Sequence, residues 1–164
     1  MEFEAFSTLD KVKVLFTNKV PDEEWNTFCV LFKNYAAETG GYVGAMCNRY
    51  EGLLIGLGSK GGLAFYKLMK QKVLSKTDIK KMRIQDGDNF VYMPKEFVDK
   101  VEIKHPPLNK KVIIVQIRFT TNDRHDLMVK LGSVDLPYQE SGINELINRY
   151  KKVRWIFNVL RLWY

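Results

Sequence analysis

The sequence is poor in the residues that build metal sites, disulfide frameworks and targeting segments. Its 164 residues include two cysteines and two histidines. A zinc site needs clustered thiols or imidazoles, and a disulfide scaffold needs several paired cysteines. We therefore predict no metal, no cofactor and no disulfide. The first residues are acidic and lack the basic and apolar regions of a signal peptide, so we expect a cytoplasmic protein, with membrane association left open.

Long hydrophobic runs are also absent. The nearest candidate for a membrane span, residues 52–68, is interrupted by Ser59, Lys60 and Lys67 and is rich in glycine, whereas a spanning helix needs about 20 apolar residues. The composition is 46% hydrophobic and 27% charged, as in globular proteins. The length is that of one domain, which we predict over residues 1–164.

Positive charge is concentrated in two segments of a chain whose net charge is +7. Residues 60–83 carry eight bases and one acid, and residues 149–161 carry five bases and no acid. This asymmetry indicates an anionic partner, which could be nucleic acid, a membrane surface or an acidic protein. The alternative is a solvated surface without a partner. The candidate contacts for an anionic partner are Lys60, Lys67, Lys70, Lys72, Lys80, Lys81, Arg83, Lys151, Lys152 and Arg154.

The N-terminal part predicts a strand followed by a helix. Alternation over residues 12–16 favours a strand or a short buried run. Pro21, three acids after it and apolar residues at helical spacing predict a helix over about residues 21–38, ended by Gly40 and Gly41.

Short apolar runs separated by turn residues follow and predict hairpins. The runs are residues 42–47, 51–57 and 63–69, with residues 48–50 as the first turn. The third run would also fit a helix. Residues 82–85 and 90–93 flank an Asp-Gly-Asp-Asn turn and predict a further hairpin.

The C-terminal half has the clearest patterns. Apolar and charged residues alternate around residues 100–105, 111–121 and 127–131, which predicts antiparallel strands with one buried face. We place His125 in the hairpin turn before the last of them. An apolar stripe at helical spacing then predicts a helix over about residues 141–160, capped by Ser141.

One glycine string resembles a nucleotide-binding fingerprint. Gly56, Gly58 and Gly61 match G-x-G-x-x-G, in which glycines let the backbone approach a pyrophosphate at a helix N-terminus. No clear helix follows the string, so we interpret it as a glycine-rich hairpin.

An E-x-K string offers the one catalytic alternative. Glu102 and Lys104, with Asp86 or Asp88 upstream, resemble the metal-binding pattern of magnesium-dependent nucleases of the restriction-enzyme fold. In those enzymes a helix follows the strand that carries this pattern, whereas prolines and another strand follow here. We assign no catalytic residue.

The end of the chain is unusually hydrophobic for an amphipathic helix. Residues 153–164 leave almost no polar side, which predicts either docking on the domain's own sheet, an oligomer contact or a membrane contact by a protruding segment. The candidate apolar contacts are Trp155, Phe157, Leu160, Trp163 and Tyr164.

Residues 89–152 resemble the second half of a bacterial pleckstrin-homology-like domain. The resemblance lies in residues 90–104, in the hairpin around Asn122 and in the helix after it. It implies an α+β fold with a curved antiparallel sheet or partial barrel. It also implies a binding module without a fixed ligand motif. We predict a non-enzymatic binding or assembly domain that contacts an anionic membrane surface, a protein partner or a second copy. A nucleic-acid-binding protein or magnesium-dependent nuclease is the alternative.

Overall fold

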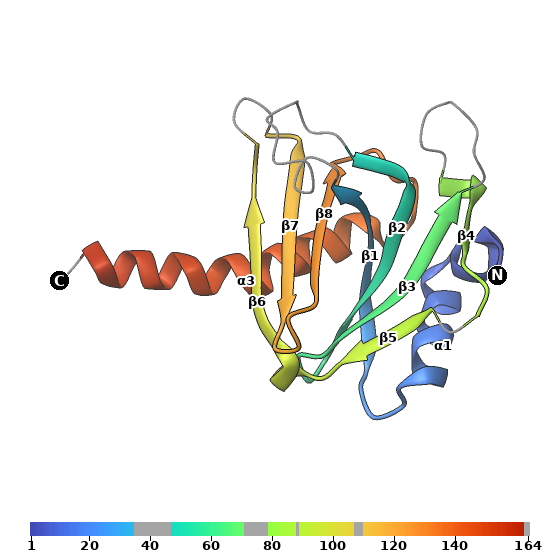
Figure 1. The fold of residues 1–164 in the computed structure, drawn as a ribbon, viewed down its shortest axis with the longest axis horizontal. Helices are drawn as coiled ribbons and strands as arrows, with labels where there is room; N and C mark the ends of the chain where they lie inside the picture. The colour runs from blue at the N-terminus through green and yellow to red at the C-terminus, as the bar shows by residue number, and fades with distance from the viewer. Residues whose placement is uncertain (35–46, 71–78, 88, 107–109, 163–164) are drawn as a thin grey trace.

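Two helices and an antiparallel sheet make up the protein in the computed structural model (Figure 1). The model describes residues 1–34, 47–70, 79–87, 89–106 and 110–162, and their side chains outside 47–50, 70 and 151–162. The helices are α1 (Leu9–Lys19) and α3 (Gln139–Leu162), and the strands are β1 (Trp25–Asn34), β2 (Cys47–Gly58), β3 (Leu63–Lys70), β4 (Met82–Ile84), β5 (Phe90–Met93), β6 (Val98–Lys104), β7 (Val112–Phe119) and β8 (Arg124–Lys130). The predicted α+β class with a curved antiparallel sheet and a helix towards each end of the chain is confirmed.

The sheet runs in the order β4-β3-β2-β1-β8-β7-β6, and β5 pairs with β3 beside β4. Its curvature brings distant strands together. The Phe65 ring on β3 lies 5.8 Å from the Phe119 ring at the end of β7, although three strands separate β3 from β7 in the sheet order. We call the face that carries these two rings the inner face. The apolar side chains of this face form much of the core.

Helix α1 covers the opposite, outer face of β1, β2 and β3. Its Phe16 ring lies 5.0 Å from the Phe28 ring and 5.3 Å from the Tyr66 ring. The backbone N–H of Lys11 donates to Thr8 Oγ1, which caps the start of the helix. Because α1 and the inner core bury both of its faces, β1 is buried without interruption from Phe28 to Phe32.

The sheet separates between β1 and β8. Among the described residues, these strands pair at two positions, Phe32 with Met128 and Lys33 with Leu127. Beyond that point the side chain of Gln139, at the start of α3, takes the place of a neighbouring strand. It donates from Nε2 to the Val30 carbonyl at 2.9 Å and accepts the Val30 N–H on Oε1 at 2.7 Å. From there α3 runs across to β6 and continues past it, away from the sheet (Figure 1).

The predicted N-terminal elements were wrong in type. Residues 25–34 of the predicted 21–38 helix form β1, and the run predicted as a first strand lies in α1. A strand buried on both faces shows no alternation, so its apolar residues also match a helical spacing. In α1, Val12 and Phe16 lie one turn apart and are both buried, whereas Val14 is exposed. Residues 35–38 lie outside the described residues.

Three predicted turns and caps were also wrong. Residues 48–50 continue β2, and the predicted hairpin of residues 82–93 does not form because β4 and β5 both pair with β3. Helix α3 begins at Gln139, two residues before the predicted cap, and the Ser141 hydroxyl donates to the Tyr138 carbonyl. The predicted strand over residues 63–69 and the three C-terminal strands are confirmed.

Candidate functional site

The glycine string forms the β2–β3 hairpin turn, as predicted, and the turn holds a carboxylate of the protein itself. Glu23 is 3% exposed, and its Oε1 accepts the backbone N–H of Lys60 at 2.9 Å and of Gly62 at 3.3 Å. A Cβ at Gly58 would lie 1.9 Å from Glu23 Oε2, so any other residue at this position would displace the carboxylate. Glu23 thus supplies the anion to which these backbone N–H groups of the turn bind.

Tyr92 on β5 lies against the same carboxylate. Burial and, after it, the charge of Glu23 raise the pKa of Tyr92 to about 12. The Trp25 ring contacts the Tyr92 ring at 6.1 Å, and Arg149 of α3 donates to the Gly58 carbonyl at 3.0 Å. These contacts give the turn a structural role, since they join β1, β2, β5 and α3 at one end of the sheet.

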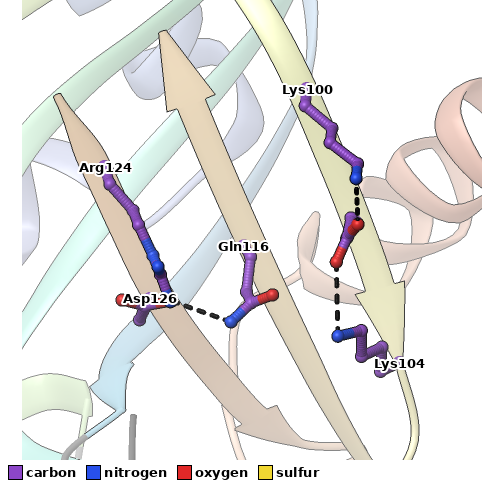
Figure 2. Close-up of polar contacts among 6 residues, drawn as sticks. Lys100, Lys104, Gln116, Arg124 and Asp126 are labelled. Atoms are coloured by element: carbon purple, nitrogen blue, oxygen red, sulfur yellow. Dashed lines mark hydrogen bonds and ion pairs between the residues drawn. The ribbon is translucent and has the colours of Figure 1, made fainter. Parts of the chain in front are cut away.

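The outer face of β6, β7 and β8 carries a ladder of charged residues (Figure 2). Glu102 on β6 lies between two lysines of its own strand, 2.5 Å from Lys100 Nζ and 3.2 Å from Lys104 Nζ. Hydrogen bonds from Lys100 and then from Lys104 lower the pKa of Glu102 to about 2. On the neighbouring strands, Gln116 and Arg124 both donate to Asp126 Oδ1.

The predicted nuclease site requires a second carboxylate close to Glu102, and this arrangement of described residues does not supply one. Asp86 follows β4, at the opposite end of the sheet order, and Asp88 lies outside the described residues. In the strand register Gln116 separates Glu102 from Asp126, which places the two carboxylates about 10 Å apart. Within residues that the structure describes, no group of three His, Cys, Asp or Glu side chains could hold a metal ion.

A cavity of about 470 Å³ opens between β1, β2, β3 and β8. We call it the His125 cavity. It is lined by Lys33, Glu51, Gly52, Leu53, Lys67, Leu68, Met69, Gln85, Arg124, His125, Asp126 and Leu127. The prediction that His125 lies in the β7–β8 turn is wrong, because β8 begins at Arg124 and His125 is its second residue. Its ring contacts the rings of Phe65 at 5.4 Å and Phe119 at 6.0 Å.

Two ion pairs balance most of the charge in the His125 cavity. Lys33 Nζ lies 3.7 Å from Glu51 Oε2, and Arg124 Nη2 lies 2.8 Å from Asp126 Oδ1. Burial lowers the pKa of His125, and the charge of Lys67 acts in the same direction. Lys67 is exposed and forms no ion pair with a described residue. It therefore supplies an excess positive charge next to a neutral imidazole.

The backbone of Lys67 forms two hydrogen bonds with the loop between β4 and β5, the two strands that pair with β3. Its N–H donates to the Asn89 carbonyl at 3.2 Å, and its carbonyl accepts the Gln85 N–H at 2.9 Å. The loop between β4 and β5 therefore fixes the point at which the Lys67 side chain leaves β3. Arg83 faces Met69 across the β3–β4 ladder and is exposed, so it adds positive charge near the same rim.

The other predicted basic contacts are only partly brought together. Lys80 and Lys81 precede β4 and are exposed, whereas Lys60 lies in the β2–β3 turn, far along β3 from Lys67. Lys70 ends β3, with its side chain outside the described part, and Lys72 is likewise outside it. The sequence did not single out Lys33, Arg124 or His125 as ligand contacts, because only the fold brings β1, β3 and β8 around one cavity.

The predicted C-terminal contacts lie at the end of α3. Lys151, Lys152 and Arg154, together with Trp155, Phe157 and Leu160, belong to the C-terminal half of α3. The C-terminal end of this helix extends past β6 (Figure 1). Trp163 and Tyr164 lie outside the described residues. Among the helices that the structure describes, none has both the length and the apolar character of a membrane span.

Comparisons of the chain with protein-family models, with curated proteins and with solved structures found no match. The pleckstrin-homology-like resemblance therefore stays a prediction.

Proposed function

We propose that this protein is a non-enzymatic binding domain that takes an anionic group, such as the phosphate of a lipid headgroup, into the His125 cavity. The observation that carries the proposal is the excess charge of Lys67 at a cavity in which the other described charges are paired. A cavity of about 470 Å³ is within the size range of small-ligand sites. A phosphate there would accept hydrogen bonds from the Lys67 ammonium and from the His125 imidazole.

The surroundings of the cavity favour a charged surface as the source of that group. Arg83, Lys80 and Lys81 extend the positive charge beyond the cavity along the β3–β4 edge. Each base near an anionic membrane adds about 1 kcal/mol to the binding free energy. The basic and apolar sequence of residues 151–164 has the composition of segments that lie at such a surface.

Vesicle cosedimentation tests the proposal. The full chain should sediment with phosphatidylcholine vesicles that contain phosphatidylserine and should stay in solution with phosphatidylcholine alone. Lys67→Ala should weaken binding several-fold, whereas Lys130→Ala, which removes an exposed lysine from the far end of β8, should not. Equal affinity of Lys67→Ala and the parent chain would remove the cavity from the proposal.

Acidification provides a second readout that a purely structural role of Lys67 would not give. A bound anion favours the protonated form of His125, so binding should tighten as the pH falls from about 7.5 to 5.5. The effect should be absent in His125→Gln. Tight, salt-dependent binding of duplex DNA without vesicle binding would instead favour the nucleic-acid alternative.

A further inference from the structure

The last strand of the sheet, β6, has one edge that pairs with no strand among the described residues. It pairs with β7 on one side and forms the end of the sheet order. None of the hydrogen bonds between described residues uses the outer edge of its backbone. The other end of the sheet differs, because the backbone of Met1 exchanges hydrogen bonds with Ile84 on β4. An edge strand with free N–H and C=O groups is a template for another strand.

The charged side chains of β6 favour one register when this strand pairs with β6 of a second copy. Lys100, Glu102 and Lys104 lie on the outer face, and Val101 and Ile103 face the core. Antiparallel pairing around a twofold axis at Val101 places Lys100 opposite Glu102 of the second copy, and Glu102 opposite Lys100. The two nearest registers that keep the faces aligned place Lys100 opposite Lys100, or Glu102 opposite Glu102. Like charges directly opposite destabilise a sheet, so one register is favoured.

Helix α3 fits the same twofold arrangement. It has 24 residues and is therefore about 36 Å long, whereas β8, β7 and β6 together span about 10 Å between strand axes. The helix continues past β6 on the side from which the second copy would approach (Figure 1). A twofold axis perpendicular to the sheet keeps both helices on one face. Each α3 would therefore extend beyond β6 towards the second copy.

From the free edge, the self-complementary charges and the overhanging helix, we infer that two copies of this chain form a symmetric dimer through antiparallel β6–β6 pairing. The interface is isologous, so the same strand serves both subunits. In each subunit Glu102 keeps its own lysines and gains Lys100 of the second copy. The charged side chains of β6 thereby determine the register in which the two copies pair. This inference does not depend on the His125 cavity.

Charge-reversal variants of the full chain, measured by light scattering and circular dichroism, test the inference. The parent chain should have twice the monomer mass of 19.2 kDa. Lys100→Glu and Glu102→Lys should each weaken the dimer at least tenfold, because each places like charges at the junction. The double variant Lys100→Glu, Glu102→Lys should restore it. Lys130→Glu is the matched control, because it makes the same charge change on an exposed lysine away from β6.

Mixing the two single variants gives the sharpest test. In a homodimer, each of these variants places like charges opposite each other. When the two variants pair, the glutamate introduced in one chain lies opposite the lysine introduced in the other, so the mixture should form a heterodimer. A monomeric parent chain, a dimer insensitive to both reversals, or a mixture without heterodimer would each overturn the inference.

Val101→Cys provides a check that does not change charge. In the proposed register the two copies of residue 101 face each other across the axis, within the Cα–Cα distance that a disulfide spans. Oxidation should therefore cross-link the folded variant between chains, and Lys130→Cys should not cross-link. Absence of the Val101→Cys cross-link in a folded dimer would rule out this register.

Discussion

Glu23 accepts the backbone N–H of Lys60 at 2.9 Å, so a side chain from the segment before β1 completes the turn between β2 and β3. The two groups are 37 residues apart in the chain. The glycine-rich string therefore forms a structural turn, and the anion that its backbone binds is the carboxylate of Glu23.

Replacing Glu23 should destabilise the fold. Glu23→Ala leaves the N–H groups of Lys60 and Gly62 without their acceptor, and an unsatisfied buried group costs about 1–3 kcal/mol. We expect a loss of about 2 kcal/mol in the free energy of unfolding, measured by urea denaturation. Glu24→Ala is the control, because Glu24 is exposed and only its backbone bonds the turn. Equal losses in the two variants would contradict the anchoring role.

Gln139→Leu should destabilise the fold through the β1 edge. Leucine nearly conserves the side-chain volume but removes both hydrogen bonds to Val30, one donated and one accepted. With two buried backbone groups unsatisfied, we expect a loss of about 2–5 kcal/mol. Glu140→Leu, on the exposed side of the same turn, should change stability by less than about 0.5 kcal/mol. Thermal unfolding of both variants tests this expectation. A melting temperature of Gln139→Leu equal to that of the parent chain would refute the role of Gln139 at the β1 edge.

Gly142→Ala sets two opposing effects against each other. Alanine improves intrinsic helix propensity by about 1 kcal/mol. However, its Cβ would lie 1.7 Å from the Phe28 carbonyl oxygen, so α3 would have to move away from β1. Overpacking of this kind costs about 1–3 kcal/mol, and the overlap here is with rigid backbone, so we expect net destabilisation. Asn144→Ala, on the exposed face of α3, should instead be neutral or slightly stabilising in the same chemical denaturation assay.

Stability should fall with acidification because of His125. Burial places the pKa of His125 in the folded state below its value of about 6.5 in the unfolded chain. Between those two pKa values the unfolded state binds more protons, so the His125 contribution is complete above pH about 6.5 and is lost as the pH falls. His125→Phe should reduce the slope of unfolding free energy against pH in this window. His105→Asn should keep it, because His125 remains in place.

The sequence predicted strands well where one face is buried and the other is charged. On β6 and β7, apolar and charged side chains alternate, and the structure follows that pattern. It could not identify β1, because α1 covers the second face of that strand and removes the alternation. The acids after Pro21 appeared to begin a helix, but Glu23 instead bonds a turn that lies far along the chain.

The His125 cavity was less predictable than the fold. Apart from Gln85, its residues come from four strands whose order in the sheet differs from their order in the chain. The sequence identifies Lys67 as a candidate contact by its charge alone. Lys33 and Arg124 line the cavity only because of the register of β1 and β8. The Asn-Asp pair at residues 122–123 marks the turn correctly, but β8 begins directly after it, at Arg124, so His125 already lies in the strand.

The narrow pairing of β1 with β8 also determines when the sheet can be completed during synthesis. Val30 and Gln139 are 109 residues apart, so β1 leaves the ribosome long before its last hydrogen-bonding partner. At about 5–20 residues per second, the interval is roughly 5 to 20 seconds. Throughout it, the strand that is buried from Phe28 to Phe32 in the finished molecule has an open edge and is prone to aggregation. The nascent chain therefore exposes this edge of β1 until α3 has been synthesised.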